Sequence, residues 1–363
     1  MISKIVTLGD VCNKGSSNIA QKDLVDRDGI YPIYGAAGYI KNVDFAHQDK
    51  PYLAVVKDGA GIGRVMKLPA NSSIIGTMQY ILPKGNIDID YLYFALQYMN
   101  LSKYFSGSTI PHIYFRDYQK EKLPLPELSE QQGKAYVLLR IEQLIEYYHQ
   151  QLTKLDELVK SQFVEMFGDP VSNAMAWQMR PLKETCTLMT GNTPSRAVKE
   201  YYGSHIEWIK SDNITNSSLY LTTAAESLSE KGAEVGRVVH PGAILMTCIA
   251  GSLNTIGNVA IVDRDVAFNQ QINAIIPHQY DTLFLCYLLK LLKPKLHEAA
   301  SSALKCILNK GNLEAFTAIV PDMALQKEFS SFVAQSDKSK LAVKQSLEKL
   351  ETLKKSLMQQ YFG

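Results

Sequence analysis

Two stretches of the chain place apolar residues at alternating intervals of three and four, which is the spacing of a coiled-coil seam. In the first stretch, Ser129–Phe167, eight of the nine seam positions are apolar. Its packing positions include Leu138, Ile141, Ile145, Tyr148, Leu152, Leu155 and Val159. Ser129 and Gln132 have the spacing of a capping box, and Gly168 follows the last periodic residue. The pattern predicts one long amphipathic helix that begins at Ser129 and ends before Gly168.

The second stretch, Ala324–Phe362, keeps this spacing less strictly. Ser336 and Lys340 occupy seam positions there, so we expect its early turns to be looser or wetter. Its apolar packing positions are Val343, Leu347, Leu350 and Leu357. One helix of this length cannot bury its apolar stripe alone. We therefore expect the two helices to pack as an antiparallel pair related by a pseudo-twofold axis.

The two helical stretches belong to an internal repeat. Leu152–Ser161 matches Leu347–Ser356 at an offset of 195 residues, and the match runs without a gap back to Pro126 and Pro321. Further upstream the offset is 194 residues, which pairs Gly63 with Gly257, Pro83 with Pro277 and Ile113 with Ile307. Near the start, Leu8 and Cys12 face Leu182 and Cys186. The repeat predicts a globular domain over 1–126, a helix over 127–168, a second globular domain over 169–321 and a second helix over 322–363.

Both globular domains contain short apolar runs typical of strands. Leu53–Val56 and Arg64–Met66 flank a glycine-rich segment, which predicts a hairpin, and Ile244–Met246 with Val259–Val262 repeats it. Helices are expected over Tyr91–Tyr98 and Leu283–Leu292. The predicted fold class is α/β (α+β), with two globular domains separated by two long antiparallel coiled-coil spacer helices.

Composition indicates a globular protein and argues against a zinc site and a membrane span. The 363 residues are 46% apolar and 20% charged, with a net charge of +2, which excludes wholesale disorder but not a local basic patch. The five cysteines lie far apart and form no C-x-x-C pair, so we expect no zinc site and a reducing compartment. No stretch resembles a signal peptide or reaches the ~18 residues of a membrane span. A cytoplasmic location is expected.

Catalytic motifs are not evident in the sequence. Gly59–Gly63 has the spacing G-x-G-x-G, which favours a hairpin turn over a dinucleotide loop. Gly133-Lys134 lies within a predicted helix, and His297-Glu298 lacks the second histidine of a zinc protease motif. Asp169-Pro170 is not followed by the proline and aromatic residue of an amino-methyltransferase. We therefore expect no catalytic residue and no metal site in this chain.

The alternation of divergent domain and long helix resembles the specificity subunit of type I restriction–modification systems. Gly191–Ser195 is similar to the opening of such a target-recognition domain, and Phe268–Asn273 to its central strand region. Leu123–Gln131 is similar to the junction into the spacer helix, and Phe167–Asp169 to the end of that helix. The first domain departs from the pattern, because Lys14–Ser17 stands where the Gly-x-Thr-Pro opening would be.

This resemblance implies a noncatalytic, sequence-specific DNA-binding subunit that reads a bipartite, asymmetric site in double-stranded DNA. It implies two modification (methyltransferase) subunits as partners, together with restriction/translocase subunits. S-adenosylmethionine, ATP and Mg are expected on those partners, and no cofactor on this chain. The alternatives are a specificity subunit of a type II-like restriction–modification enzyme and a coiled-coil protein-binding scaffold. A stand-alone enzyme has almost no support in the sequence.

Sequence-specific DNA binding needs hydrogen-bonding groups at base edges and cations at phosphates. Polar loops with nearby cations supply both, although ordinary surface loops have the same composition. The candidates in the first domain are Lys57, Arg64, Ser108, Thr109, His112, Tyr114 and Arg116. Those in the second are Asn192, Thr193, Ser195, Arg196, Lys199, Lys210, Asn213, Ser301, Ser302, Lys305 and Lys310. We expect Trp208 to belong to the core rather than to stack on a base.

Overall fold

The computed structural model describes residues 4–106, 111–215, 218–300 and 306–363. These residues form two compact units, each described here by itself. Unit 1 comprises Met1–Gln151 and Val343–Gly363, and unit 2 comprises Leu152–Ala342. Each unit therefore contains one globular part and segments of both long helices, α4 (Leu128–Phe167) and α10 (Met323–Phe362). The proposed domain boundaries at 126, 168 and 321 stay predictions.

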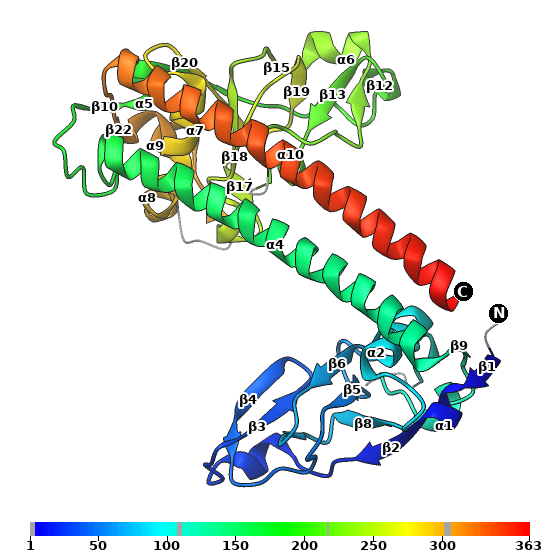
Figure 1. The fold of residues 1–363 in the computed structure, drawn as a ribbon. Helices are drawn as coiled ribbons and strands as arrows, with labels where there is room; N and C mark the ends of the chain where they lie inside the picture. The colour runs from blue at the N-terminus through cyan, green and yellow to red at the C-terminus, as the bar shows by residue number, and fades with distance from the viewer. Residues whose placement is uncertain (1–3, 107–110, 216–217, 301–305) are drawn as a thin grey trace. The chain divides into compact units, whose positions relative to one another are not determined.

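An antiparallel four-stranded sheet forms the centre of unit 1 (Figure 1). Its order is β2 (Cys12–Ser16), β8 (Met78–Pro83), β5 (Tyr52–Val56) and β6 (Val65–Leu68). All five residues of β5 are buried because both faces of the strand are covered. Leu53 and Val55 pack with helix α2 (Ile89–Met99), whereas Tyr52, Ala54 and Val56 pack on the opposite face. The predicted hairpin and the predicted helix at Tyr91–Tyr98 are confirmed.

A smaller sheet and a closing strand pair complete unit 1. The smaller sheet has the order β4 (Gly38–Val43), β3 (Tyr31–Gly35) and β7 (Ser73–Ile74), with β3 and β7 parallel. Strand β1 (Lys4–Thr7) pairs with β9 (Lys122–Leu125) just before α4 begins. The short helices are α1 (Leu8–Val11) and α3 (Phe115–Tyr118), with 3-10 turns at Gln21–Leu24 and Leu101–Tyr104.

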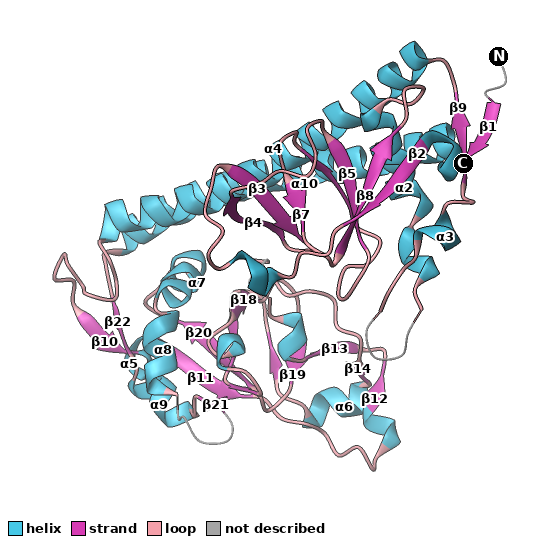
Figure 2. Cartoon of the chain, turned by 90° about the horizontal axis from the view of Figure 1, so that it is seen from below, coloured by secondary structure: helices cyan, strands magenta, loops and turns pink. Residues whose placement is uncertain are grey.

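Unit 2 repeats this plan (Figure 2). Its central sheet is β11 (Cys186–Thr190), β20 (Ile272–Pro277), β16 (Ile244–Thr247) and β18 (Val259–Ile261), with helix α7 (Thr282–Leu291) packed on one face. β10 (Met179–Pro181) pairs with β22 (Thr317–Ile319), as β1 pairs with β9. Cys12 lies opposite Pro83, and Cys186 lies opposite Pro277. The internal repeat and the second hairpin are therefore confirmed.

The second sheet is where unit 2 differs from unit 1. It has five strands in the order β12 (Tyr202–Gly203), β14 (Ser227–Leu228), β13 (Ile206–Ile209), β19 (Val266–Phe268) and β15 (Val238–Val239). The parallel pair β13–β19 corresponds to the parallel pair β3–β7 of unit 1. The remaining elements are β17 (Ile249–Ala250), β21 (Cys306–Ile307), α5 (Leu182–Thr185), α6 (Glu230–Val235), α8 (Lys293–Ala299) and α9 (Lys310–Ala315), with 3-10 turns at Lys199–Tyr201, Ser211–Asn213 and Leu253–Thr255.

The long helices run antiparallel within each unit. In unit 1, Lys354 of α10 pairs with Glu142 of α4 at 2.6 Å, while Lys134 of α4 lies over the ring of Tyr361. The residue number therefore falls along α10 as it rises along α4. Unit 2 shows the same direction, because Lys340 pairs with Asp156 and the rings of Phe329 and Phe163 meet at 5.3 Å between centroids.

The predicted seam residues are buried or half-buried in both helices. Leu138, Ile141 and Val159 are buried, and the remaining predicted positions are half-buried. Gly168 adopts a left-handed backbone with φ of +75° immediately after α4, which confirms the predicted end of the helix.

Two predictions about the helices are wrong. Helix α4 begins at Leu128, so Ser129 lies inside its first turn and is not its N-cap. The early turns of α10 are not wetter, because Ser336 is only 6% exposed and the Lys340 side chain only 13% exposed. Lys340 reaches Asp156 at 2.6 Å and Asp337 at 3.6 Å, so ion pairs replace the expected water.

Candidate nucleic-acid interface

The structure brings five predicted residues of unit 1 to one surface. The loop after β5 carries Lys57 and Arg64, and it contacts the segment that leads into α3. The Gly59 amide donates to the Pro111 carbonyl at 3.0 Å, and the Ile113 amide donates to the Lys57 carbonyl at 3.0 Å. The side chains of Asp58 and His112 are hydrogen bonded as well. These bonds hold the two polar loops together as one surface.

Tyr114 is the centre of this surface. Its ring lies 4.1 Å from that of His112, and the Arg116 guanidinium lies 4.6 Å from the Tyr114 ring centroid. Arg116 has a side chain that is 74% exposed and only a loose contact of 3.6 Å with Asp117. A guanidinium held over an aromatic ring and open to solvent is well placed to contact a phosphate.

Glycines allow the β5–β6 loop to approach this surface. Gly59, Gly61 and Gly63 have φ of +82°, +89° and +80°, a conformation that other residues rarely adopt. A Cβ on Gly63 would lie 2.5 Å from the Ser102 amide nitrogen, so a side chain there would push the loop away. The G-x-G-x-G pattern is therefore a hairpin turn, as predicted.

A shallow hollow of about 520 Å³ extends the basic surface beside Arg116. It is lined by Asn13 and Lys14 of β2 and by Arg116 and Gln119 at α3. Lys14 is exposed and was not among the predicted contacts. The only feature of the sequence that could have indicated a contact at Lys14 is the local cluster Lys14–Ser17, and this cluster resembles no family motif. Lys14 and Arg116 are 102 residues apart in the sequence, so only the fold places them around one hollow.

Unit 2 places two predicted cations around a buried tryptophan. The Arg196 guanidinium lies 4.3 Å from the ring centroid of Tyr202 and 5.1 Å from that of Trp208, and Lys210 lies 5.2 Å from Trp208. Trp208 is 3% exposed, so its core position is confirmed. Glu226 receives hydrogen bonds from Lys210 and Arg196, which hold the pKa of its carboxyl below the usual range.

Two predicted asparagines have their amides engaged by the protein itself. Asn192 donates to the Val235 carbonyl at 2.8 Å and accepts from the Arg237 amide at 2.8 Å. Buried Asn213 accepts from the Lys210 amide at 3.0 Å and donates to the Thr223 carbonyl at 3.1 Å. These bonds hold the loops that present Arg196 and Lys210, and contact of either asparagine with DNA stays a prediction.

The two family motifs of unit 2 lie against each other. The Gly191 amide donates to the Ile272 carbonyl at 3.0 Å, and the Asn192 amide donates to the Phe268 carbonyl at 3.1 Å. A Cβ on Gly191 would lie 2.2 Å from the Asn269 carbonyl oxygen, so glycine is required at this approach. Thr193 is hydrogen bonded to Gln270.

The other predicted residues of unit 2 lie on separate elements. Ser195, the last residue of the Gly191 motif, and Lys199, four residues after it, are exposed. Lys310 begins α9 and pairs with Glu314 at 3.3 Å, while β17 and β21 form a short ladder before it. Ser108, Thr109, Ser301, Ser302 and Lys305 lie outside the described residues. A role in DNA contact stays a prediction for every candidate named from the sequence.

Cysteine chemistry adds nothing to this surface. Burial raises the pKa of Cys12 to about 12 and that of Cys186, Cys248 and Cys286 to about 11. These four thiols are protonated at neutral pH and are not nucleophiles.

Within 4–106, 111–215, 218–300 and 306–363, no group of three His, Cys, Asp or Glu side chains is arranged to hold a metal ion. Over the same ranges, no helix is both long and apolar enough to cross a membrane.

The protein-family model for the type I restriction modification DNA specificity domain matches residues 3–157 and 175–353 of this chain. The chain belongs to this family. The two matched regions correspond to the two copies of the repeat, so the family domain occurs twice.

Curated relatives and solved structures agree with this assignment. The HindI specificity subunit of Haemophilus influenzae is 32% identical over 31% of this chain and 24% of that protein. The MjaVIII specificity subunit of Methanocaldococcus jannaschii is 24% identical over 64% of this chain and 59% of that protein. The matched regions thus span a quarter to three-fifths of these two relatives.

The fold is shared over nearly the whole chain with a crystal structure of a type I restriction–modification S subunit from M. genitalium. The TM-score is 0.65 at 14% identity, covering 99% of this chain and 96% of that one. A chain from a type I R-M system, solved to explain complex assembly and conformational transition, matches with a TM-score of 0.53 at 15% identity, over 99% and 97% of the two chains.

Proposed function

We propose that this chain selects the DNA sequence on which a type I restriction–modification complex acts, and that it reads a bipartite, asymmetric site. The observation that carries the proposal is the unequal duplication. The central sheets of the two units correspond strand for strand, whereas the second sheets have three and five strands. Equal frameworks suit equal docking on DNA, and unequal second sheets suit two different half-sites.

The role proposed for the chain is noncatalytic. Methylation of adenine is assigned to two modification subunits, and cleavage to restriction subunits. S-adenosylmethionine, ATP and Mg belong to those partners in this scheme. Helix α4 supports docking of such a partner, because in unit 1 it exposes Tyr136, Val137, Leu144 and Tyr147 along the helix outside its packed seam. A cytoplasmic location is part of the same proposal.

The test is a genome-wide map of adenine methylation by long-read sequencing. Cells would express the modification subunit with this chain, without it, or with another specificity chain. We expect one new methylated motif that has two different half-sites and depends on this chain. The other specificity chain serves as the control that the modification subunit is active. No new motif, despite an active modification subunit, would contradict the proposal and favour a protein-binding scaffold.

The same cells distinguish a type II-like system. A type I complex needs ATP to cleave DNA, so a lysate that restricts unmethylated DNA should do so only when ATP is present. Restriction without ATP would assign the chain to a type II-like enzyme and leave the specificity role intact.

A further inference from the structure

A buried glutamine joins the first turn of each long helix to the globular part of its unit. Gln131 of α4 is 1% exposed and Gln326 of α10 is 0% exposed. The two residues are 195 positions apart, the offset of the helical repeat. Both continue the heptad register of the seam, since Gln131 lies seven residues before Leu138 and Gln326 lies fourteen residues before Lys340.

In unit 1 the Gln131 amide makes three hydrogen bonds to the backbone. Its Oε1 accepts from the Asp88 amide at 2.8 Å, and its Nε2 donates to the carbonyls of Pro126 at 2.9 Å and Asn86 at 3.2 Å. Asp88 is the N-cap of α2, because its carboxylate accepts from the amides of Asp90 and Tyr91 at 2.9 Å. Gln131 therefore connects the start of α4 to the start of α2.

Unit 2 repeats these bonds with different neighbouring residues. Gln326 Oε1 accepts from the Asp281 amide at 2.9 Å, and Nε2 donates to the carbonyls of Pro321 at 2.8 Å and Gln279 at 3.4 Å. Asp281 is the N-cap of α7, and its carboxylate also accepts from the Ser330 hydroxyl. The same three bonds thus occur in two units whose second sheets differ.

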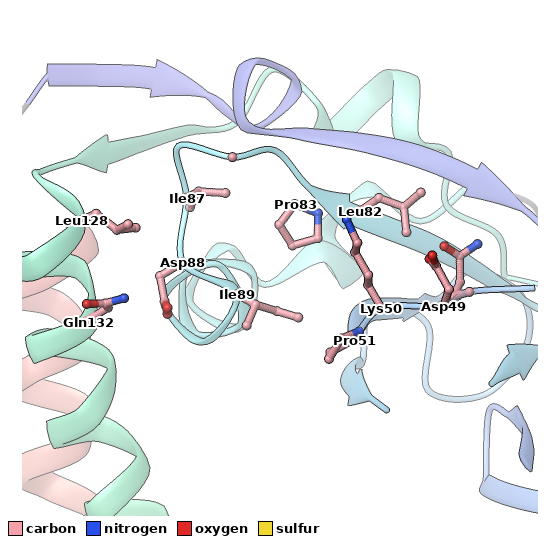
Figure 3. Close-up of a pocket in the computed structure, with 12 residues that line it drawn as sticks. Asp49, Lys50, Pro51, Leu82, Pro83, Ile87, Asp88, Ile89, Leu128 and Gln132 are labelled. Atoms are coloured by element: carbon pink, nitrogen blue, oxygen red, sulfur yellow. The ribbon is translucent and has the colours of Figure 1, made fainter. Parts of the chain in front are cut away.

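Apolar packing and the Gln131 bonds both act at this junction, because Ala135 and Leu138 of α4 are buried in one cluster with Tyr91 of α2. A surface hollow of about 520 Å³ lies beside the Gln131 hydrogen bonds, and its lining includes Leu128 and Gln132 of α4 and Asp88 of the α2 cap. Figure 3 shows Leu128 and Gln132 on the helix, across the hollow from Ile87 and Asp88. Apolar packing is non-directional, whereas the hydrogen bonds of Gln131 are directional, so they add a constraint on the angle between helix and globular part.

We infer that Gln131 and Gln326 are positioning residues that set the orientation of each recognition domain on its spacer helix, and so the gap between half-sites that the complex accepts. The inference rests on the proposed function. The Gln131 side chain is replaced by an apolar one in Gln131→Leu, which removes all three bonds and leaves the helix face apolar. Gln345→Leu makes the same change at an exposed position of α10 in unit 1, away from the junction hollow, and is the matched control.

The first experiment measures orientation in the full chain without partners. Spin labels are attached at Tyr39→Cys and Gln143→Cys, both exposed positions of unit 1. Double electron–electron resonance then measures the distance between the small sheet and α4. The background is Cys306→Ser, which leaves only the four buried native cysteines. We expect Gln131→Leu to broaden or shift the distance distribution and Gln345→Leu to leave it unchanged. An unchanged distribution in Gln131→Leu would overturn the inference.

The second experiment maps methylation in cells that carry the modification subunit and each variant. We expect Gln131→Leu and Gln326→Leu to methylate the same two half-sites. Methylation of sites whose gap is one base pair longer or shorter should rise about tenfold. That change corresponds to ~1.4 kcal/mol in the free energy that discriminates between gaps. Fewer methylated sites at one unchanged gap would show a purely structural role and overturn the inference. If the unmodified chain yields no bipartite motif, the proposed function fails, and the spin-label distances still decide whether the glutamines set orientation.

Discussion

At the scale of single residues, the prediction that follows most directly concerns Arg116. Its guanidinium lies over Tyr114, is open to solvent and adjoins Lys14 across a shallow hollow. If it contacts one phosphate, Arg116→Gln should weaken binding of the assembled methyltransferase to all DNA sequences alike. The slope of log affinity against log salt should fall in magnitude by about 0.9. Fluorescence anisotropy at several salt concentrations, with cognate and scrambled duplexes, measures both effects.

The control for Arg116 is Lys349→Gln on α10, which removes the same charge from an exposed position outside the basic surface and should leave the slope unchanged. A loss of affinity confined to the cognate duplex would instead assign Arg116 to base reading. Equal slopes for Arg116→Gln and the unmodified chain would remove Arg116 from the DNA interface.

Residue roles were the least predictable part of the molecule from sequence. Asn192 and Asn213 have the side chains of base-reading residues, yet their amide partners at Val235, Arg237 and Thr223 hold loops together. Arg196 and Lys210 share Glu226, which lies 16 or more residues away in the chain. Such partners are set by strand pairing, which local sequence patterns do not encode.

At the scale of elements, Ser336 of α10 offers a test of the helix seam. Its hydroxyl oxygen is buried and has no hydrogen-bond partner among the described residues. A buried, unpaired hydroxyl costs about 1–3 kcal/mol, and alanine favours a helix more than serine does. Ser336→Ala should therefore raise the free energy of unfolding of the chain by ~1 kcal/mol, measured as a higher urea midpoint by circular dichroism.

Ser339→Ala is the control for Ser336, because Ser339 is exposed and its hydroxyl donates to the Gln335 carbonyl four residues back at 3.3 Å. We expect Ser339→Ala to change the free energy of unfolding by only a few tenths of a kcal/mol, and so to leave the urea midpoint nearly unchanged. A lower midpoint for Ser336→Ala would mean that the hydroxyl stabilises the helix pair rather than weakening it.

Elements with a strong local period were predictable, and the others were not. The seam of α4, the two hairpins and helices α2 and α7 follow spacing rules that act within about 40 residues. The second sheets escaped prediction because β12, β14 and β15 have two residues each and gain stability only from pairing. The capping box at Ser129 was wrong because α4 begins one residue earlier, at Leu128, so Ser129 already lies inside the helix.

At the scale of the whole molecule, the repeat predicted two domains of one fold, but not what joins each domain to its helix. In unit 2 the junction consists of Phe163, Phe167 and Phe329 packed around Phe284, together with the Gln326 bond to Asp281. Only Phe284 and Asp281 belong to the globular part. A transplanted domain therefore needs an aromatic residue and an N-cap aspartate at these two positions to join the existing helices.

This junction makes exchange of Val171–Val320 the sharpest test of modular reading. The segment carries its own closing pair β10–β22 and both sheets of unit 2, so it brings a complete recognition domain. With a donor that keeps the counterparts of Phe284 and Asp281, methylome sequencing should show one new half-site, the other half-site unchanged and the same gap. The matched control is a donor whose aromatic counterpart is changed to alanine, which should lower the amount of folded chain without altering either half-site. A change at both half-sites would contradict independent reading, because unit 1 contains no residue of the exchanged segment.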